Sequence, residues 1–163
     1  MTVWLALDIG ERRIGMATGN DQARLARPVA IITRRSKRED FAAISRTVAA
    51  VEATHVLVGL PFNMDGSEGF QATRVRNFVR HLQRQLPLPA EFWDERLSSF
   101  AADEILHEID QRRRRSQVRL GAHNDDVAAA TILQSYFDDL RSGDLMRDGA
   151  APPPSKLGPP STR

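Results

Sequence analysis

Three acidic residues lie at the ends of predicted strands or at the start of a predicted helix, positions that are common for catalytic carboxylates. Asp8 ends a short apolar run, Glu95 (or Asp94) closes the apolar segment that begins at Ala90, and Asp125 opens the last helical pattern of the chain. A carboxylate at the end of a buried strand is costly unless a partner compensates its charge. If the three converge, their mutual repulsion calls for a cation. The chain has no cysteine, and an oxygen-only ligand set suits Mg²⁺ or Mn²⁺.

Such a site predicts metal-dependent hydrolysis of a phosphodiester. Two divalent ions can hold the attacking water and the leaving oxygen, so no nucleophilic serine, cysteine or lysine is required. Each acid also has an ordinary structural alternative. These alternatives are a turn residue for Asp8, a local ion-pair cluster for residues 94–96, and a helix cap or first-turn residue for Asp125 or Asp126.

The elements that must position these acids follow from hydrophobic periodicity. Continuous or alternating apolar runs predict strands at residues 3–8, 13–17, 26–33, 55–60 and 90–95, with Pro28 favouring an edge position for the third. Apolar stripes at helical spacing predict helices at 39–52, 70–86, from Ser98 or Ser99 onward, and at 124–140. On the last helix Asp125 shares a face with small residues, which would let this face lie close to the sheet.

This order of elements predicts an α/β fold. An antiparallel start followed by alternating strands and helices makes a mixed central sheet, with antiparallel first strands, then parallel strands, and helices on both faces. Ligand sites of such sheets lie beyond the carboxyl ends of the strands. Residues 1–141 are expected to form one domain, and the Pro-, Gly- and Ser-rich residues 142–163 a disordered tail.

Composition limits the classes of protein. The chain has 163 residues and 41% hydrophobic residues, which fits one globular domain. It has no run of about 20 apolar residues and no signal-peptide pattern, so we expect a cytoplasmic protein without a membrane partner. Lys37 and Lys156 are the only lysines among 23 basic residues. The planar guanidinium of arginine suits phosphate contacts, although a composition bias explains the excess equally well.

Several polar residues are candidates for holding a nucleic acid. They are Arg12, Arg13, Asn63, Arg96, Arg112, Arg113, Arg114, Arg115 and Arg119. The run that begins at Arg112 is the best candidate for phosphate binding, with a solvated loop as the alternative. Arg96 could pair with Glu95 or reach the nucleic-acid backbone, and the internal pairing is expected. Trp93, Phe62 and Phe70 could stack on bases, but packing in the core is the expected role.

Four blocks of the sequence closely resemble the YqgF/RuvX family. They are residues 7–17 (LDIGERRIGMA), 58–69 (VGLPFNMDGSEG), 94–99 (DERLSS) and 125–130 (DDVAAA), in the order and spacing of the family. The second block is the most specific, and the resemblance covers about residues 3–140. Arg12 stands where the family commonly has lysine and Ser99 where it commonly has threonine, so no acid is lost.

The resemblance implies a ribonuclease H-like fold and a metal-dependent nuclease. It implies that Asp8, Glu95 and Asp125 hold Mg²⁺ or Mn²⁺, with Asp125 preferred to Asp126 because it stands eight residues before Leu133. It also implies hydrolysis at the 5′ end of pre-16S ribosomal RNA, or resolution of Holliday junctions in branched DNA. The expected partners are nucleic acid and ribosomal particles.

Two other classes remain open at this point. A non-catalytic nucleic-acid-binding module could keep the same fold, although the three acids count against it. Asp-x-Gly hairpins also open actin-like and sugar-kinase ATPases, but those need two domains around a nucleotide. The chain could act as a monomer or a homodimer, since a junction resolvase needs two active sites.

Overall fold

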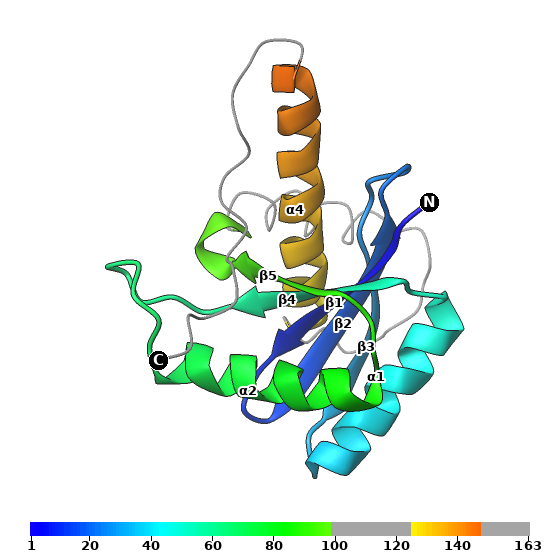
Figure 1. The fold of residues 1–163 in the computed structure, drawn as a ribbon, viewed down its shortest axis with the longest axis vertical. Helices are drawn as coiled ribbons and strands as arrows, with labels where there is room; N and C mark the ends of the chain where they lie inside the picture. The colour runs from blue at the N-terminus through cyan, green and yellow to red at the C-terminus, as the bar shows by residue number, and fades with distance from the viewer. Residues whose placement is uncertain (99–124, 148–163) are drawn as a thin grey trace, which may run out of the picture.

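The computed structural model describes residues 1–98 and 125–147, which form a sheet with helices on both of its faces (Figure 1). The sheet has five strands in the order β3-β2-β1-β4-β5. The strands are β1 Val3–Ile9, β2 Arg13–Asn20, β3 Arg27–Thr33, β4 His55–Leu60 and β5 Ala90–Asp94. The helices are α1 Lys37–Val51, α2 Phe70–Gln85 and α4 Asp125–Arg147, with a short 3₁₀ turn, η1, at Glu95–Ser98.

The pairing of the strands confirms the predicted mixed sheet. β1 pairs antiparallel with β2, and β2 antiparallel with β3. β1 then pairs parallel with β4, and β4 parallel with β5. Pro28 lies on the edge strand β3, as expected for a residue that cannot donate a ladder hydrogen bond.

The first face of the sheet carries the larger core. The side chains of Leu5 and Leu7 on β1 point to this face, where α1 and α2 cover them. Ile44 of α1 is fully buried, and Phe41 of α1 meets Phe78 of α2 with ring centroids 5.1 Å apart. The apolar stripes predicted for both helices therefore form the packing surface on this side.

The second face is covered by α4, whose apolar surface is made largely of small residues. Ala129, Ala130 and Leu133 are fully buried, and they pack with Trp4 and Ala6 of β1. Small side chains let a helix axis approach a sheet closely. This confirms that the face predicted for the last helix lies on the sheet.

Some element boundaries differ from the sequence prediction. α1 begins at Lys37 rather than at residue 39, because the side chain of Ser36 accepts a hydrogen bond from the Glu39 amide and caps the helix. β5 ends at Asp94, and Glu95 opens η1 instead of closing the strand. α4 continues to Arg147, beyond the predicted helix end at 140 and into the segment expected to be tail.

Two predictions fall on parts of the chain that lie outside the described residues. They are the helix expected after Ser99 and the remainder of the tail, residues 148–163. Among the described residues, no helix combines the length and the apolar character that a membrane span requires.

Candidate active site

Asp8 lies near the end of β1 and belongs to the face that α4 covers. Side chains alternate along a strand, so Asp8 continues the series of Trp4 and Ala6, which pack against α4. Asp8 is opposite Gly15 of β2 in the antiparallel ladder. It is half-buried. The alternation visible in the sequence is therefore enough to place this carboxylate at the carboxyl end of the sheet's central strand.

Glu95 reaches the same face from two strands away. β5 is paired with β4 up to the partners Leu60 and Asp94, so Glu95 stands just beyond the end of the ladder. Its side chain lies across the backbone of Gly59. A Cβ on Gly59 would meet Glu95 Oε1 at 2.7 Å and the Ile132 side chain of α4 at 2.5 Å. The absence of a side chain at position 59 thus makes the space that Glu95 occupies.

The carboxyl groups of Asp8 and Glu95 are in direct contact. The pKa of Glu95 is raised to about 7, first by burial and then by the negative charge of Asp8, a hydrogen bond to Asp8 and the charge of Asp94. The structure therefore brings together two of the three predicted acids, one on β1 and the other just beyond the end of β5. In the absence of a cation, such a pair shares a proton because two adjacent carboxylates repel each other.

Asp125 is the first residue of α4, and the side chain of this residue lies outside the described part of the structure. Within residues 1–98 and 125–147, no three His, Cys, Asp or Glu side chains form a ready-made metal site. The structure describes only the carboxyl pair of Asp8 and Glu95, and the role of Asp125 as a third ligand remains a prediction. The packing of Ala129 and Ile132 on the sheet fixes the axis of the helix that would carry it.

Arg96 is engaged with Asp94, the acid next to the carboxyl pair. Its guanidinium donates through Nε and a terminal nitrogen to both carboxylate oxygens of Asp94, at 2.6 to 3.1 Å. The Arg96 backbone amide also donates to Asp94 Oδ1 at 2.9 Å. The internal pairing predicted for Arg96 is thus present, with Asp94 as a partner. The contact holds the first turn of η1, and so orients Glu95.

The loop between β4 and α2 is ordered by its own side chains. The Asn63 amide group donates to Ser67 Oγ at 3.0 Å, and Asp65 accepts from the Ser67 amide and hydroxyl groups. These hydrogen bonds lower the pKa of Asp65. Gly66 has φ +85°, which a residue without a Cβ adopts at little cost. Asn63, predicted to contact nucleic acid, therefore has a structural role in this loop.

Arg96 also connects this loop with η1. Its guanidinium carbon lies 5.2 Å from the centroid of the Phe62 ring, a cation–π contact. The loop projects from the carboxyl end of β4 (Figure 1), so Arg96 joins the two segments that border the carboxyl pair. Sequence reasoning missed this contact because Phe62 and Arg96 are distant along the chain.

The other predicted nucleic-acid contacts are only partly described. Arg12 and Arg13 are exposed beside the β1–β2 turn, close in sequence to Asp8, as a phosphate contact would require. The arginine run from 112 to 119 lies outside the described residues. The role of these arginines remains a prediction.

The three aromatic candidates behave differently from one another. Trp93 packs in the second core and donates to Ser135 Oγ at 3.3 Å, and Phe62 is half-buried under Arg96, as predicted. The expectation is wrong for Phe70, which is 77% exposed at the start of α2. The helical pattern misleads here because the apolar stripe of α2 begins only at Ala72.

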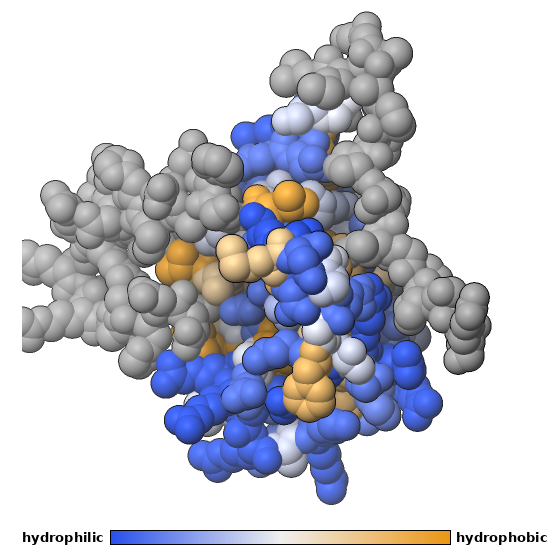
Figure 2. Space-filling model, turned by 90° about the vertical axis from the view of Figure 1, so that its left-hand side faces the viewer, coloured by the Kyte–Doolittle hydropathy of each residue, from blue (hydrophilic) through white to orange (hydrophobic). Residues whose placement is uncertain are grey.

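The side of the molecule on which the β4–α2 loop projects is mainly hydrophilic. Figure 2 shows this side, with hydrophobic side chains scattered over it and not joined in a continuous area. The exposed large hydrophobic residues near this end of the sheet are Met64, Phe70 and Leu97.

Comparison with known proteins decides the family. A family model described as "RuvX: Holliday junction resolvase" matches residues 2–139. The chain belongs to the RuvX family. Relatives of this RuvX protein carry the name "Putative pre-16S rRNA nuclease". The one from Moorella thermoacetica (strain ATCC 39073 / JCM 9320) is 44% identical over 137 residues, which cover 83% of this chain and 94% of the relative.

A second relative of the same name comes from Anaeromyxobacter sp. (strain Fw109-5). It is 42% identical over 135 residues, 83% of this chain and 96% of the relative. The RuvX chain thus spans nearly the whole length of these relatives, and the resemblance stated from the four sequence blocks is confirmed.

Solved structures confirm the ribonuclease H-like fold of this RuvX chain. "T. thermophilus RuvC in complex with Holliday junction substrate" has a TM-score of 0.58 at 14% identity, over 88% of this chain and 97% of that one. "Crystal Structure of the Yeast Mitochondrial Holliday Junction Resolvase, Ydc2" has a TM-score of 0.57 at 10% identity, over 89% and 81%. At such low identities the likeness concerns the fold alone.

Proposed function

We propose that this RuvX chain is a divalent-metal-dependent nuclease whose centre is the carboxyl pair of Asp8 and Glu95, completed by Asp125. The observation that carries the proposal is the direct contact of Asp8 and Glu95 at the carboxyl end of the sheet. Two acids from distant strands are brought together there although their contact is electrostatically unfavourable. A structural role alone gives no reason to keep such a pair.

The donor set fits Mg²⁺ or Mn²⁺. Carboxylate oxygens are the ligands that these ions prefer. The pKa of Glu95 is raised first by burial and then by the neighbouring charge of Asp8, and a divalent cation would balance the charge of the two carboxylates. Asp8, Glu95 and Asp125 would hold the metal. When bound, it would stabilise charge on the phosphate and lower the pKa of a water molecule.

The protein's own residues prepare this centre. Gly59 leaves room for the Glu95 side chain, and Ile132 of α4 lies against the same space, which shields one side of Glu95 from water. Asp94 and Arg96 fix the turn that carries Glu95. Exposed Arg12 and Arg13 beside the β1–β2 turn would attract the phosphate backbone to this edge.

The substrate that the relatives' name favours is precursor 16S ribosomal RNA. Cleavage near its 5′ end is what the family resemblance of the four sequence blocks implies. The product ends would be a 5′-phosphate and a 3′-hydroxyl, and ribosomal particles would be the setting. The second candidate substrate is a four-way DNA junction, favoured by the description of the family model and by the fold neighbours. A junction resolvase would require two copies of the site and hence a homodimer.

A cleavage assay with three substrates tests the function. The full chain is incubated with a pre-16S-like RNA, an unstructured RNA and a four-way DNA junction, each with Mg²⁺ and with Mn²⁺. We expect cleavage of the precursor RNA, and none by Asp8→Asn protein that keeps its circular dichroism spectrum. Full activity of Asp8→Asn would refute the assigned centre. Absence of any cleavage by the wild-type chain would favour a non-catalytic nucleic-acid-binding module.

Metal binding is measured separately, without any cleavage. Mn²⁺ at about 100 times its dissociation constant should stabilise the folded chain by about 2.7 kcal/mol. Thermal unfolding monitored with and without Mn²⁺ measures this shift. The Asp8→Asn variant should lose most of it, whereas an equal shift in both proteins would place the ion elsewhere.

A further inference from the structure

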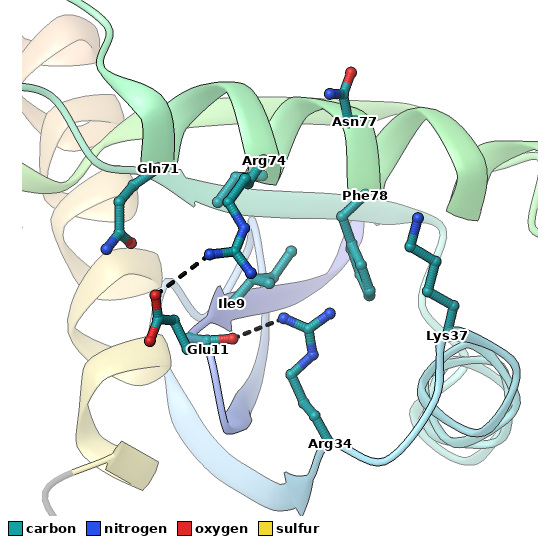
Figure 3. A pocket seen from close by; sticks show the side chains of 10 residues that line it. Ile9, Glu11, Arg34, Lys37, Gln71, Arg74, Asn77 and Phe78 are labelled. Atoms are coloured by element: carbon teal, nitrogen blue, oxygen red, sulfur yellow. Dashed lines mark hydrogen bonds and ion pairs between the residues drawn. The ribbon is translucent and has the colours of Figure 1, made fainter.

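A cavity of about 240 Å³ opens beside the β1–β2 turn, on the face of the sheet opposite the carboxyl pair (Figure 3). Side chains of α2, the β1–β2 turn and the start of α1 surround it. Its charged lining consists of Arg34, Lys37, Arg74 and Glu11. Three cations thus stand against one carboxylate, which favours an anionic ligand.

Arg34 is held in place by hydrogen bonds, and part of the donors of Arg34 and Lys37 stay available to a ligand. Arg34 donates to Asp40 Oδ2 at 2.9 Å and to the Gly10 carbonyl at 2.8 Å. Within the described part of the chain, these two bonds use only part of the N–H groups of the guanidinium. The ammonium group of Lys37 has no ion pair or hydrogen bond among the described residues. The pocket therefore offers fixed donors to a ligand.

Arg74 is held by a contact that a stronger anion can replace. It extends from α2 into the pocket and meets Glu11 Oε1 at 3.3 Å (Figure 3). Both side chains are more than half exposed, at 51% and 65%, and ion pairs of this kind contribute little to stability. A phosphate group, which accepts bidentate bonds from a guanidinium, would compete well with this carboxylate.

Arg74 also connects the pocket with an exposed aromatic ring. Its guanidinium carbon lies 5.6 Å from the centroid of Phe70, the residue that is 77% exposed at the start of α2. Exposed aromatic rings next to cations are the usual platforms on which proteins stack the bases of single strands. Phe70 is therefore placed to stack on a base while the neighbouring pocket binds a phosphate of the same strand.

The position along β1 relates this subsite to the carboxyl pair. Ile9 and Gly10 line the pocket and directly follow Asp8 in the chain. Successive side chains of a strand point to opposite faces, so Asp8 and Ile9 face the two sides of one strand end. A nucleic-acid strand that crosses the end of β1 would meet both.

We propose that this pocket binds a backbone phosphate of a single-stranded RNA substrate, one that flanks the cleaved bond, with an adjacent base stacked on Phe70. The inference deepens the proposed nuclease function and rests on it for the identity of the ligand. Arg74 and Lys37 bind the phosphate, Arg34 positions the Gly10 turn, and Glu11 holds Arg74 until the phosphate arrives.

Binding of a fluorescent ten-nucleotide single-stranded RNA tests the subsite. All variants of the full chain carry Asp8→Asn, so that the RNA stays intact. Arg74→Gln should weaken binding several-fold and reduce the slope of log K against log salt by about 0.7, the loss of one phosphate contact on a single strand. Glu11→Gln should strengthen binding, because it removes the competing carboxylate. Unchanged affinity in both variants would overturn the inference.

Two matched variants separate local contacts from general charge. Arg84→Gln removes the same charge from an exposed residue of α2 ten positions further on, about 15 Å along the helix, and should leave the salt slope unchanged. A slope reduced equally in Arg84→Gln and Arg74→Gln would show general attraction and refute the pocket. Phe70→Ala should weaken binding about fivefold or more, and Phe70→Tyr should restore it.

The RNA-binding measurements and the cleavage assay test the two proposals separately. If the wild-type chain cleaves RNA while the Arg74, Glu11 and Phe70 variants bind like the parent protein, the subsite is wrong and the nuclease proposal stands. If the wild-type chain cleaves nothing, the nuclease proposal fails, and the pattern of affinities still decides whether RNA occupies this pocket.

Discussion

The two faces of the sheet are built differently although they share the same strands. On one face Leu5 and Leu7 of β1 pack under two helices in a core of large apolar side chains. On the other, Trp4 and Ala6 pack under α4 through small residues, and the series ends in Asp8. The comparison shows that one face supplies most of the buried apolar volume, while the other keeps α4 close to a pair of carboxyl groups.

Because the two faces are packed differently, substitutions in them should have different effects. Some should lower only the stability of the fold, and others should also lower activity. On the α1/α2 face, the core is separate from the carboxyl pair, so a truncation inside that core should lower stability and leave the carboxyl pair undisturbed. On the α4 face, the atoms that pack the helix also contact the pair, since Ile132 and Glu95 share the space above Gly59. The following predictions test this separation.

The largest effect is expected from a comparison of two neighbouring acids. Glu95→Gln should reduce the cleavage rate about 1000-fold or more, because metal ligands supply several kcal/mol of charge stabilisation in the transition state. Asp94→Asn is the matched control, since Asp94 binds Arg96. It should lower the rate about tenfold or less. Initial rates on the precursor RNA measure both, and equal losses would show that Glu95 has no special role.

A pair of core truncations compares the two faces directly. Ile44 of α1 and Leu133 of α4 are both fully buried, so replacing either with alanine should cost about 2–5 kcal/mol of unfolding free energy. Only Leu133→Ala should also reduce the cleavage rate of the folded protein, because α4 carries Asp125. Urea unfolding and cleavage rates measure the two effects. A rate lowered to the same extent by Ile44→Ala would contradict the separation of the faces.

Gly59→Ala should disturb the carboxyl pair and the packing of α4 together. The new methyl group would overlap Glu95 Oε1 and the Ile132 side chain, and overpacking of this kind costs about 1–3 kcal/mol. Gly143→Ala is the control within α4, because a Cβ there meets nothing within 4 Å. It should stabilise the helix by up to about 1 kcal/mol. Thermal unfolding and cleavage rates distinguish the two variants.

The smallest effect is a pH dependence of the metal-free protein. The folded pKa of Glu95, about 7, lies above that of an exposed carboxyl group, so the unfolded chain loses this proton first. The free energy of unfolding should therefore fall as pH rises through the interval between the two pKa values. Asp8→Asn removes one cause of the shift and should stabilise the metal-free fold by about 1 kcal/mol above this interval. Chelator-treated protein, unfolded in urea across the pH range, measures it, and an identical pH profile in both proteins would contradict the contact.

The sequence predicts those parts of the site that depend on the hydrophobic pattern of a few neighbouring residues. Alternation along β1 places Asp8, and the apolar run of β4 places the strand that ends beside it, because strand periodicity is a property of a few neighbouring residues. The face of α4 that packs on the sheet is likewise visible as a stripe of alanines. The family resemblance adds the pairing of Asp8 with Glu95, which periodicity alone does not give.

The parts that fail depend on individual contacts that a periodic pattern does not encode. The 3₁₀ turn at Glu95 forms where Asp94 accepts from the Arg96 amide, and no periodicity predicts this change. Phe70 was expected in the core, yet it lies two positions before Ala72, where the packed stripe of α2 begins. The pocket beside the β1–β2 turn was missed because its lining comes from three segments that are distant along the chain.

The way α4 is packed gives the protein a natural optical reporter. The chain contains only two tryptophans, and both contact the same residue of α4. The centroids of Trp4 and Trp93 lie 4.9 and 5.5 Å from the ring of Tyr136. Separation of α4 from the sheet would expose both indole rings to water at once and shift their fluorescence to longer wavelengths. Docking of the helix that carries Asp125 can thus be followed in real time, in unlabelled protein, while a metal or an RNA is added.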